Sequence, residues 1–252
     1  MKLIDTHAHL EDIEDLEGAL DRAERANVIA IITMGYDYKS NLWVIKESQK
    51  YCRKNLRIYP ALGVHPWAAN KPGVDDALKL VKKNVRDAVA VGEIGLDYWY
   101  KEVRKNPEAR KTQLNLFRRL LELARDHGKP VSIHSRGAWR DCLNITLESG
   151  VERVVFHWFS GPLDVLDGIV EHGYFISATP AAAYSREHRL AIKNAPIENI
   201  LLETDSPVSY RGDVAEPAYV LRSLSAVAEL KGLSKEAVAE QTLKNARNLF
   251  NI

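Results

Sequence analysis

Short apolar runs alternate with amphipathic stretches along the whole chain of 252 residues. Strands that alternate strictly with helices predict a parallel sheet, because each helix returns the chain to the same edge of the sheet, and eight such repeats predict closure into a barrel. We expect an α/β protein with the (β/α)8 (TIM) barrel fold. The eight strands are expected at residues 3–6, 28–33, 57–62, 89–93, 131–134, 154–157, 174–178 and 200–204.

Helices are expected where apolar residues recur at helical spacing. They are placed at residues 13–26, 41–52, 75–85, 107–126, 139–148, 163–171, 215–230 and 234–250. A chain of 252 residues is close to the ~250 typical of one such barrel, so we expect a single domain over residues 1–252.

The composition is that of an ordinary globular protein, with 46% hydrophobic and 27% charged residues. No apolar run approaches the ~18 residues of a membrane span, and a charge at Asp5 comes too early for a signal peptide. We therefore expect a soluble, cytoplasmic protein without membrane contact. Cys52 and Cys142 lie far apart and lack a paired spacing, which favours reduced core thiols over a disulfide or a zinc site.

The first expected strand leads into His7 and His9. Alternate residues of a strand point to the same side, so this pair is suited to bind a metal ion. Taken alone, the pair is equally well explained as two ordinary strand histidines. Other apolar runs, however, also end in metal-capable residues, namely Glu93, His134, His157 and Asp205. Catalytic groups gather at the carboxyl ends of the strands in such barrels, whereas a doubly wound open sheet, the alternative fold, would not bring these five strand ends together.

Seven motifs carry a resemblance to a known family. They are DTHAHL at 5–10, GVHP at 63–66, GEIGLDY at 92–98, IHSR at 133–136, HWFSG at 157–161, ETDSP at 203–207 and EPAY at 216–219. Through them the chain resembles the TatD-type metal-dependent hydrolases and nucleases over nearly its whole length. The resemblance implies a β/α barrel that holds a pair of divalent metal ions and acts as a phosphodiesterase, typically a deoxyribonuclease. Two positions depart from the family pattern: Gly137 stands where an acidic or amide residue is more usual, and the loop between Pro207 and Glu216 is short. The short loop bears on substrate preference, not on the chemistry.

The resemblance implies a role for each candidate ligand. His7, His9 and Asp205 would bind one metal ion, His134 and His157 the other, and Glu93 would bridge them. A bridging anion offsets the repulsion between two cations. Related barrel hydrolases often use a carboxylated lysine as this anion, but Glu93 would supply the charge here, so no modified lysine is required. The ions, expected to be Mg²⁺, Mn²⁺ or Zn²⁺, would activate water for attack on phosphorus, while Asp205 orients that water and accepts its proton. The alternatives are a turn or helix-capping role for Asp205 and a buried ion pair for Glu93.

Further polar residues lie beside these motifs. His65 is assigned to phosphate contact or leaving-group protonation, with a turn histidine held by Pro66 as the alternative. Arg136 and Arg211 are candidate phosphate clamps, although surface ion pairs are equally expected. Glu203 and Asp5 share strand parity with ligands and are candidates for orienting the ligand histidines. The remaining histidines, His127, His172 and His188, are expected to be structural.

The charge pattern favours a limited nucleic-acid contact. The net charge of +1 provides no global field for a long duplex, but residues 101–119 carry seven basic and two acidic side chains, or +5. This segment would guide a phosphate backbone toward the barrel mouth, or it is simply a solvated helix face. Tyr98, Trp99, Tyr100 and Trp158 would stack on splayed bases or pack under loops.

We favour a metal-dependent, exonuclease-like phosphodiesterase that trims DNA or RNA from an end, acting on a single strand or a frayed end, because a narrow barrel mouth admits a frayed strand more easily than an intact duplex. Two other classes of function remain open. The first is hydrolysis of an ester or amide in a small molecule or aminoacyl-tRNA, because activated water also attacks carbonyl carbon. The second is a metal-binding or scaffold protein without enzymatic activity.

Overall fold

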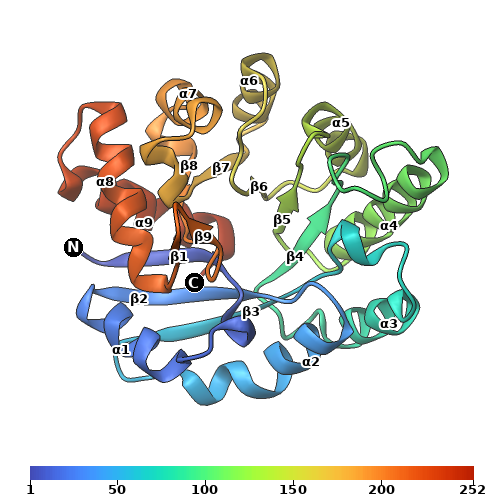
Figure 1. The fold of residues 1–252 in the computed structure, drawn as a ribbon, viewed down its shortest axis with the longest axis horizontal. Helices are drawn as coiled ribbons and strands as arrows, with labels where there is room; N and C mark the ends of the chain where they lie inside the picture. The colour runs from blue at the N-terminus through green and yellow to red at the C-terminus, as the bar shows by residue number, and fades with distance from the viewer.

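The computed structural model describes residues 1–252 as eight parallel strands surrounded by helices (Figure 1). Each strand pairs in parallel with the next one along the chain, which confirms the predicted barrel. The strands are β1 (Leu3–Ala8), β2 (Val28–Met34), β3 (Arg57–Leu62), β4 (Ala90–Gly95), β5 (Val131–His134), β6 (Val154–Phe156), β7 (Phe175–Ala178) and β8 (Ile200–Leu202). All lie within two residues of the expected bounds.

The barrel closes between β1 and the segment that follows β8. The backbone N–H of His9 donates to the carbonyl of Ser206 at 2.8 Å, and the N–H of Asp205 donates to the carbonyl of His7 at 2.9 Å. Ala8 also forms a parallel bridge with Ser206. Closure through this segment brings the ends of the first and last strands, and their candidate ligands, to the same place.

Nine α-helices lie around the outside of the strands (Figure 1). They are α1 (Leu16–Arg25), α2 (Tyr38–Glu47), α3 (Val74–Asn84), α4 (Pro107–Asp126), α5 (Trp139–Ser149), α6 (Leu163–Glu171), α7 (Arg186–Asn194), α8 (Val220–Lys231) and α9 (Lys235–Phe250). Sequence analysis missed α7. This helix is only 9 residues long and buries just His188, Ala191 and Ile192, which is too little apolar periodicity to detect.

Capping residues explain where several helices begin and end. The Asp15 side chain accepts from the N–H of Gly18 at 3.1 Å, so α1 begins later than expected. The longest helix, α4, begins with an Asn106 cap followed by Pro107, and it buries one apolar face against the barrel. At two helix ends, His127 and His172 bond through Nδ1 to carbonyls of their own last turns at 3.0 and 2.8 Å, which agrees with the structural roles expected for them.

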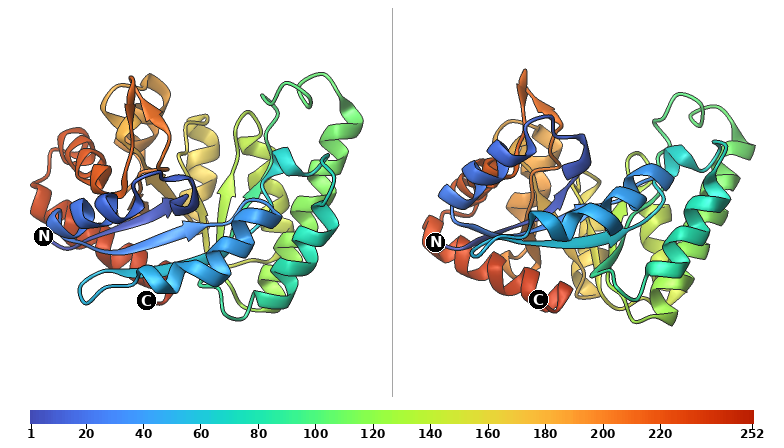
Figure 2. Two further views of the ribbon diagram at one scale, coloured as in Figure 1. Left: turned by 60° about the horizontal axis from the view of Figure 1, so that its bottom comes forward. Right: turned by 90° about the horizontal axis from the view of Figure 1, so that it is seen from below.

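The rest of the structure adds a few details. Between β8 and α8, the strands β9 (Ser209–Tyr210) and β10 (Asp213–Val214) form a small antiparallel hairpin that projects from the body (Figure 2). Both cysteines are free thiols; Cys142 is buried and Cys52 is partly exposed. The structure contains no helix that is both long enough and apolar enough to span a membrane.

Candidate metal centre

The residues singled out from the sequence meet at the carboxyl ends of the strands. β1 presents His7, with His9 just beyond its end; β4 presents Glu93; and β5 presents His134. His65, His157 and Asp205 follow β3, β6 and β8 within three residues. Sequence positions more than 190 residues apart are therefore brought into one cluster. Its members are His7, His9, His65, Glu93, His134, His157 and Asp205.

Glu93 lies at the centre of this cluster, and its two carboxylate oxygens face different histidines. Oε1 lies 2.8 Å from Nδ1 of His134, 2.9 Å from Nε2 of His157 and 3.3 Å from Nε2 of His65. Oε2 lies 3.5 Å from Nε2 of His7 and 3.6 Å from Nε2 of His9. One buried carboxylate thus joins two groups of imidazoles.

Asp205 belongs to the group that contains His7 and His9. Its Oδ1 lies 3.6 Å from Nε2 of His7 and 3.5 Å from Nε2 of His9. The backbone of Asp205 has a φ of +50°, an uncommon conformation for a residue other than glycine. The hydrogen bond from its backbone N–H to the carbonyl of His7 holds the residue in this position. Across the site, Nδ1 of His134 lies 3.3 Å from Nε2 of His157.

Close packing of β4 against β5 allows Glu93 to reach His134. Gly95 has a φ of +141°, and a Cβ atom at this position would lie 1.9 Å from the carbonyl oxygen of His134. Only glycine fits such a close backbone approach. The glycine in the GEIGLDY motif therefore has a packing role that brings two candidate ligands together.

A backbone contact orients the ring of His9 within the cluster. Nδ1 of His9 lies 3.1 Å from the carbonyl oxygen of Met34, which can only accept, so Nδ1 carries the proton. When the His9 ring is neutral, its lone pair lies on Nε2, which is 3.3 Å from Nε2 of His7. Buried imidazole nitrogens and carboxylate oxygens gathered in this way form a donor set for divalent transition metals. Three overlapping groups of three potential ligands have donor atoms within 4.8 Å of one another: His7–His9–Glu93, His65–Glu93–His134 and His7–His157–Glu203.

Burial and mutual attraction shift the protonation of the cluster. Burial by itself would raise the pKa of Glu93, but the surrounding imidazoles of His65, His157 and His134 hold it well below its usual range. Burial would lower the pKa of His9, but Asp205 and Glu93 raise it to about 9. Without a metal, protons therefore provide part of the positive charge that these carboxylates require.

His65 has a different protonation state from His9. Burial lowers the pKa of His65 to about 3, so its ring is neutral at physiological pH. Nδ1 accepts from the backbone N–H of Trp67 at 3.2 Å, which leaves the proton on Nε2. This Nε2–H group points at Oε1 of Glu93, 3.3 Å away. His65 is thus a neutral hydrogen-bond donor at the edge of the cluster.

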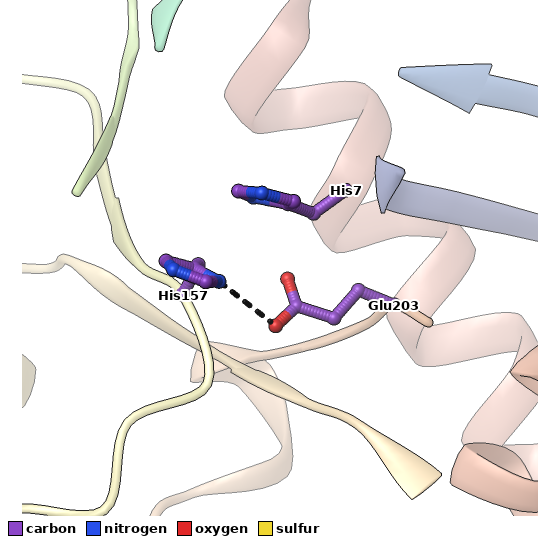
Figure 3. A group of neighbouring side chains, drawn as sticks. All are labelled: His7, His157 and Glu203. Atoms are coloured by element: carbon purple, nitrogen blue, oxygen red, sulfur yellow. Dashed lines mark ion pairs between the residues drawn. The ribbon is translucent and has the colours of Figure 1, made fainter. Parts of the chain in front are cut away.

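Two carboxylates contact the outer nitrogens of candidate ligands. Glu203 lies beside His157, and Figure 3 shows this pair together with His7, whose ring stacks on that of His157 with centroids 4.1 Å apart. Asp97 Oδ2 lies 3.3 Å from Nε2 of His134. Asp97 was not among the candidates from the sequence. It lies four residues after Glu93, so on a strand the two side chains would point to the same side, and this spacing could have identified it.

Two residues singled out from the sequence have other contacts. Asp5 does not touch an imidazole; its carboxylate accepts from the backbone N–H of His7 at 3.3 Å and from the N–H and hydroxyl of Thr204 at 2.9 and 2.6 Å. These bonds tie β1 to the segment that follows β8. Nδ1 of His7 instead lies 3.3 Å from Oγ of Ser132, a contact that the sequence did not suggest.

The candidate phosphate clamps are engaged with protein groups. Nη2 of Arg136 lies 2.7 Å from Oδ2 of Asp97, so Arg136 forms an ion pair, the alternative to a phosphate clamp that the sequence left open. The guanidinium of Arg211 lies over the ring of Tyr184, 4.1 Å from its centroid. Next to Arg136, Gly137 has a φ of +71°, and a Cβ atom there would lie 2.4 Å from the Trp99 indole.

The aromatic residues expected near the site differ in exposure. Tyr98 is half-buried and donates through its hydroxyl to Asp141 at 2.8 Å, and Trp158 packs against Tyr210. Both have the packing role that was the alternative for them. Trp99 is 60% exposed, and Tyr100 is half-buried beside Trp67.

Comparison with known proteins supports the family resemblance that the motifs indicate. The model of the family described as TatD related DNase matches residues 4–251. The human deoxyribonuclease TATDN3 is 32% identical over 262 residues, which cover 98% of this chain and 94% of that protein. The metal-dependent hydrolase YabD of Bacillus subtilis is 30% identical over 262 residues, which cover 99% of each chain.

Solved structures show the same likeness in three dimensions. The TatD homologue YJJV from Escherichia coli superimposes with a TM-score of 0.87 at 29% identity, covering 99% of this chain and 98% of that one. A TatD-family hydrolase from Entamoeba histolytica superimposes with a TM-score of 0.84 at 25% identity, with coverage of 99% and 98%. A family match over nearly the whole chain and relatives above 30% identity lead to one conclusion. The chain belongs to the TatD-related DNase family.

Proposed function

We propose that this protein is a divalent-metal-dependent phosphodiesterase that hydrolyses DNA with activated water, beginning at a single strand or a frayed end. The central observation is the position of Glu93, whose two oxygens face His134 and His157 on one side and His7 and His9 on the other. A carboxylate between two groups of nitrogen ligands is suited to two cations and also balances their charge. The family membership and the metal-dependent relatives support the same assignment.

The residues of the chain have separate tasks in this proposal. His7, His9 and Asp205 would hold one ion, His134 and His157 the other, and Glu93 both. The bound ions supply Lewis acidity, which activates water near neutral pH and offsets charge on the phosphate oxygens. Burial would raise the pKa of Asp205, but His9 and His7 lower it, so its carboxylate is ionised and accepts a proton at an Oδ atom.

His65 is assigned to the substrate side of the site. Its neutral ring keeps a proton on Nε2, which faces Glu93 Oε1; in this role the Nε2–H group would donate to a phosphate oxygen or to the leaving oxygen instead of to Glu93. Because burial keeps the ring neutral, the histidine does not add a further positive charge next to the candidate metal ligands. This protonation supports a donor role for His65.

Nucleic acid fits the charge pattern better than a small ester. The protein has a net charge of only +1, but exposed Lys101, Arg104 and Lys105 follow β4 closely. Such a segment contacts a few phosphates without attracting long duplexes indiscriminately. Hydrolysis of an ester or amide uses the same activated water, yet it leaves this basic segment without a function.

A substrate panel tests the proposal. Single-stranded DNA, RNA, aminoacyl-tRNA and simple esters are incubated with the metal-stripped protein after addition of Mg²⁺, Mn²⁺ or Zn²⁺. We expect turnover of DNA that disappears on chelation and returns with metal. His134→Ala should abolish this turnover, whereas His172→Ala, which changes an exposed histidine at a helix end, should not. Full activity in thoroughly metal-free protein, or turnover of esters alone, would overturn the assignment.

A further inference from the structure

Three aromatic side chains form a row along the rim of the metal centre. The ring of Tyr36 lies 5.3 Å from that of His9, between centroids, and Trp67 follows 6.3 Å from Tyr36. Trp67 also packs edge-to-face on His65 at 4.3 Å, and Tyr100 lies 6.4 Å beyond it. We call Tyr36, Trp67 and Tyr100 the aromatic row.

The row is exposed although its members are large. Trp67 is 43% exposed, and both tyrosines are partly exposed. An exposed tryptophan leaves apolar surface in water, and a cluster of such surface beside a catalytic site indicates ligand contact. None of the three rings belongs to the buried hydrophobic core.

Buried hydrogen bonds hold the row in place. The Pro66 carbonyl, next to Trp67, accepts from the fully buried Gln113 amide at 3.0 Å, and Gln113 in turn accepts from the N–H of Asp97 at 3.0 Å. Asp97 Oδ1 accepts from the N–H of Tyr100 at 3.1 Å. The loops after β3 and β4 are therefore tied together through Gln113, which fixes the backbone that carries Trp67 and Tyr100.

From this geometry we infer that the aromatic row is a stacking platform for the nucleobase beside the phosphate at the metal centre. The inference rests on the proposed function and deepens it by naming the surface that would contact the unpaired bases of a single-stranded substrate. Aromatic rings stack on the faces of unpaired bases with little regard to sequence, whereas the bases of a duplex hide their faces from a flat surface. The exposed charges of Lys101, Arg104 and Lys105 continue from Tyr100 and suit the adjoining phosphates.

The test compares base-containing and base-free substrates. One substrate is a short single-stranded oligonucleotide; the second has the same backbone with abasic tetrahydrofuran units in place of its nucleotides. Wild type, Trp67→Ala, Trp67→Phe and the control Tyr38→Ala, which removes a 46% exposed tyrosine at the start of α2, are assayed as metal-loaded enzymes for kcat and KM. Equilibrium binding of the labelled oligonucleotides in EDTA is measured separately.

The platform predicts a specific pattern. Trp67→Ala should weaken binding and raise KM for the base-containing oligonucleotide by about 5- to 150-fold, the range for loss of one stacked base. Trp67→Ala should leave kcat, and the KM for the abasic oligonucleotide, nearly unchanged. Trp67→Phe, which keeps an aromatic ring, should raise KM for the base-containing oligonucleotide less than Trp67→Ala does. Tyr38→Ala should behave as wild type. Equal losses on both oligonucleotides, or no loss on either, would overturn the inference. Trp67-dependent binding without hydrolysis of any nucleic acid would instead refute the proposed function and leave the platform intact.

Discussion

Glu203 and His157 form a buried pair in which the carboxylate faces the outer nitrogen of the imidazole. Oε1 of Glu203 lies 3.5 Å from Nδ1 of His157 and accepts a hydrogen bond of 2.9 Å from the next backbone amide, that of Trp158 (Figure 3). Burial would lower the pKa of His157, but Glu93 and Glu203 raise it well above its usual value. A carboxylate at Nδ1 favours a proton on that nitrogen and leaves Nε2 to face Glu93, as metal-binding histidines require.

The pair predicts that Glu203→Gln weakens metal binding. The amide keeps the shape and an oxygen for the Trp158 amide, but it removes the negative charge that orients His157. We expect the metal affinity to fall about 10- to 100-fold, the range for loss of such an outer partner. Calorimetric titration of the stripped protein measures the affinity, with Glu229→Gln on the surface of α8 as the control. An unchanged affinity would show that Glu203 serves the fold alone.

We expect substitution of Asp205 to reduce hydrolysis while the fold is kept. Asp205→Asn keeps the side-chain shape but removes the basic oxygen, so hydrolysis should fall by the ~10² to 10⁴ expected for loss of a general base. The fold should persist, because the contact between this residue and His7 uses its backbone. His9→Ala should mainly reduce metal binding. Steady-state rates on a minimal phosphodiester provide the measurement, and Asp213→Asn, at an exposed position, is the control. Normal turnover by Asp205→Asn would contradict the role of general base.

Salt dependence should reveal whether phosphates contact the basic segment. For a single-stranded substrate, the logarithm of the apparent affinity should fall with the logarithm of salt concentration, with a slope of about 0.7 per neutralised phosphate. Replacing Arg104 and Lys105 together by glutamine should reduce that slope and spare the hydrolysis of bis-p-nitrophenyl phosphate. The matched control removes the exposed charges of Lys82 and Lys83 at the far end of α3. If both activities fell together, the segment would instead support the barrel mouth.

A buried histidine outside the metal centre predicts acid sensitivity. Nδ1 of His188 donates to the Phe159 carbonyl at 2.8 Å, and Nε2 accepts from the Thr179 N–H at 3.1 Å. Burial lowers the pKa of His188 to about 4. Between that value and the usual 6.5 the unfolded chain binds more protons than the folded one, so this residue reduces the free energy of unfolding as the pH falls through this window.

His188→Gln should remove this contribution to pH dependence. On lowering the pH from about 7 to about 5, the wild type should lose about 2 kcal/mol more than the variant, as one such shift implies. Urea unfolding of both metal-stripped proteins at each pH provides the measurement, and the metal-stripped state removes the effect of losing metal in acid. Parallel losses in the two proteins would show that His188 keeps its ordinary pKa when folded.

Local sequence patterns determined most of the barrel and the candidate ligands. The apolar runs marked every strand, because a strand buried between the barrel interior and the helices leaves few polar positions. His7 and His9 were recognisable from strand periodicity, and Glu93 and His134 from their place at the ends of apolar runs. Both signals depend only on neighbouring residues. The short α7 escaped detection, because its 9 residues bury only three side chains and so show little apolar periodicity.

Only the tertiary structure decided which partners these residues meet. Strand parity placed Asp5 with His7, yet the closure of the barrel turns the Asp5 carboxylate toward backbone amides at the seam. Arg136 is bound by Asp97, and Trp67 joins Tyr36 across two loops. Side-chain direction along a strand repeats every two residues and can be read locally, whereas contacts between loops depend on register, turn geometry and the packing of distant segments.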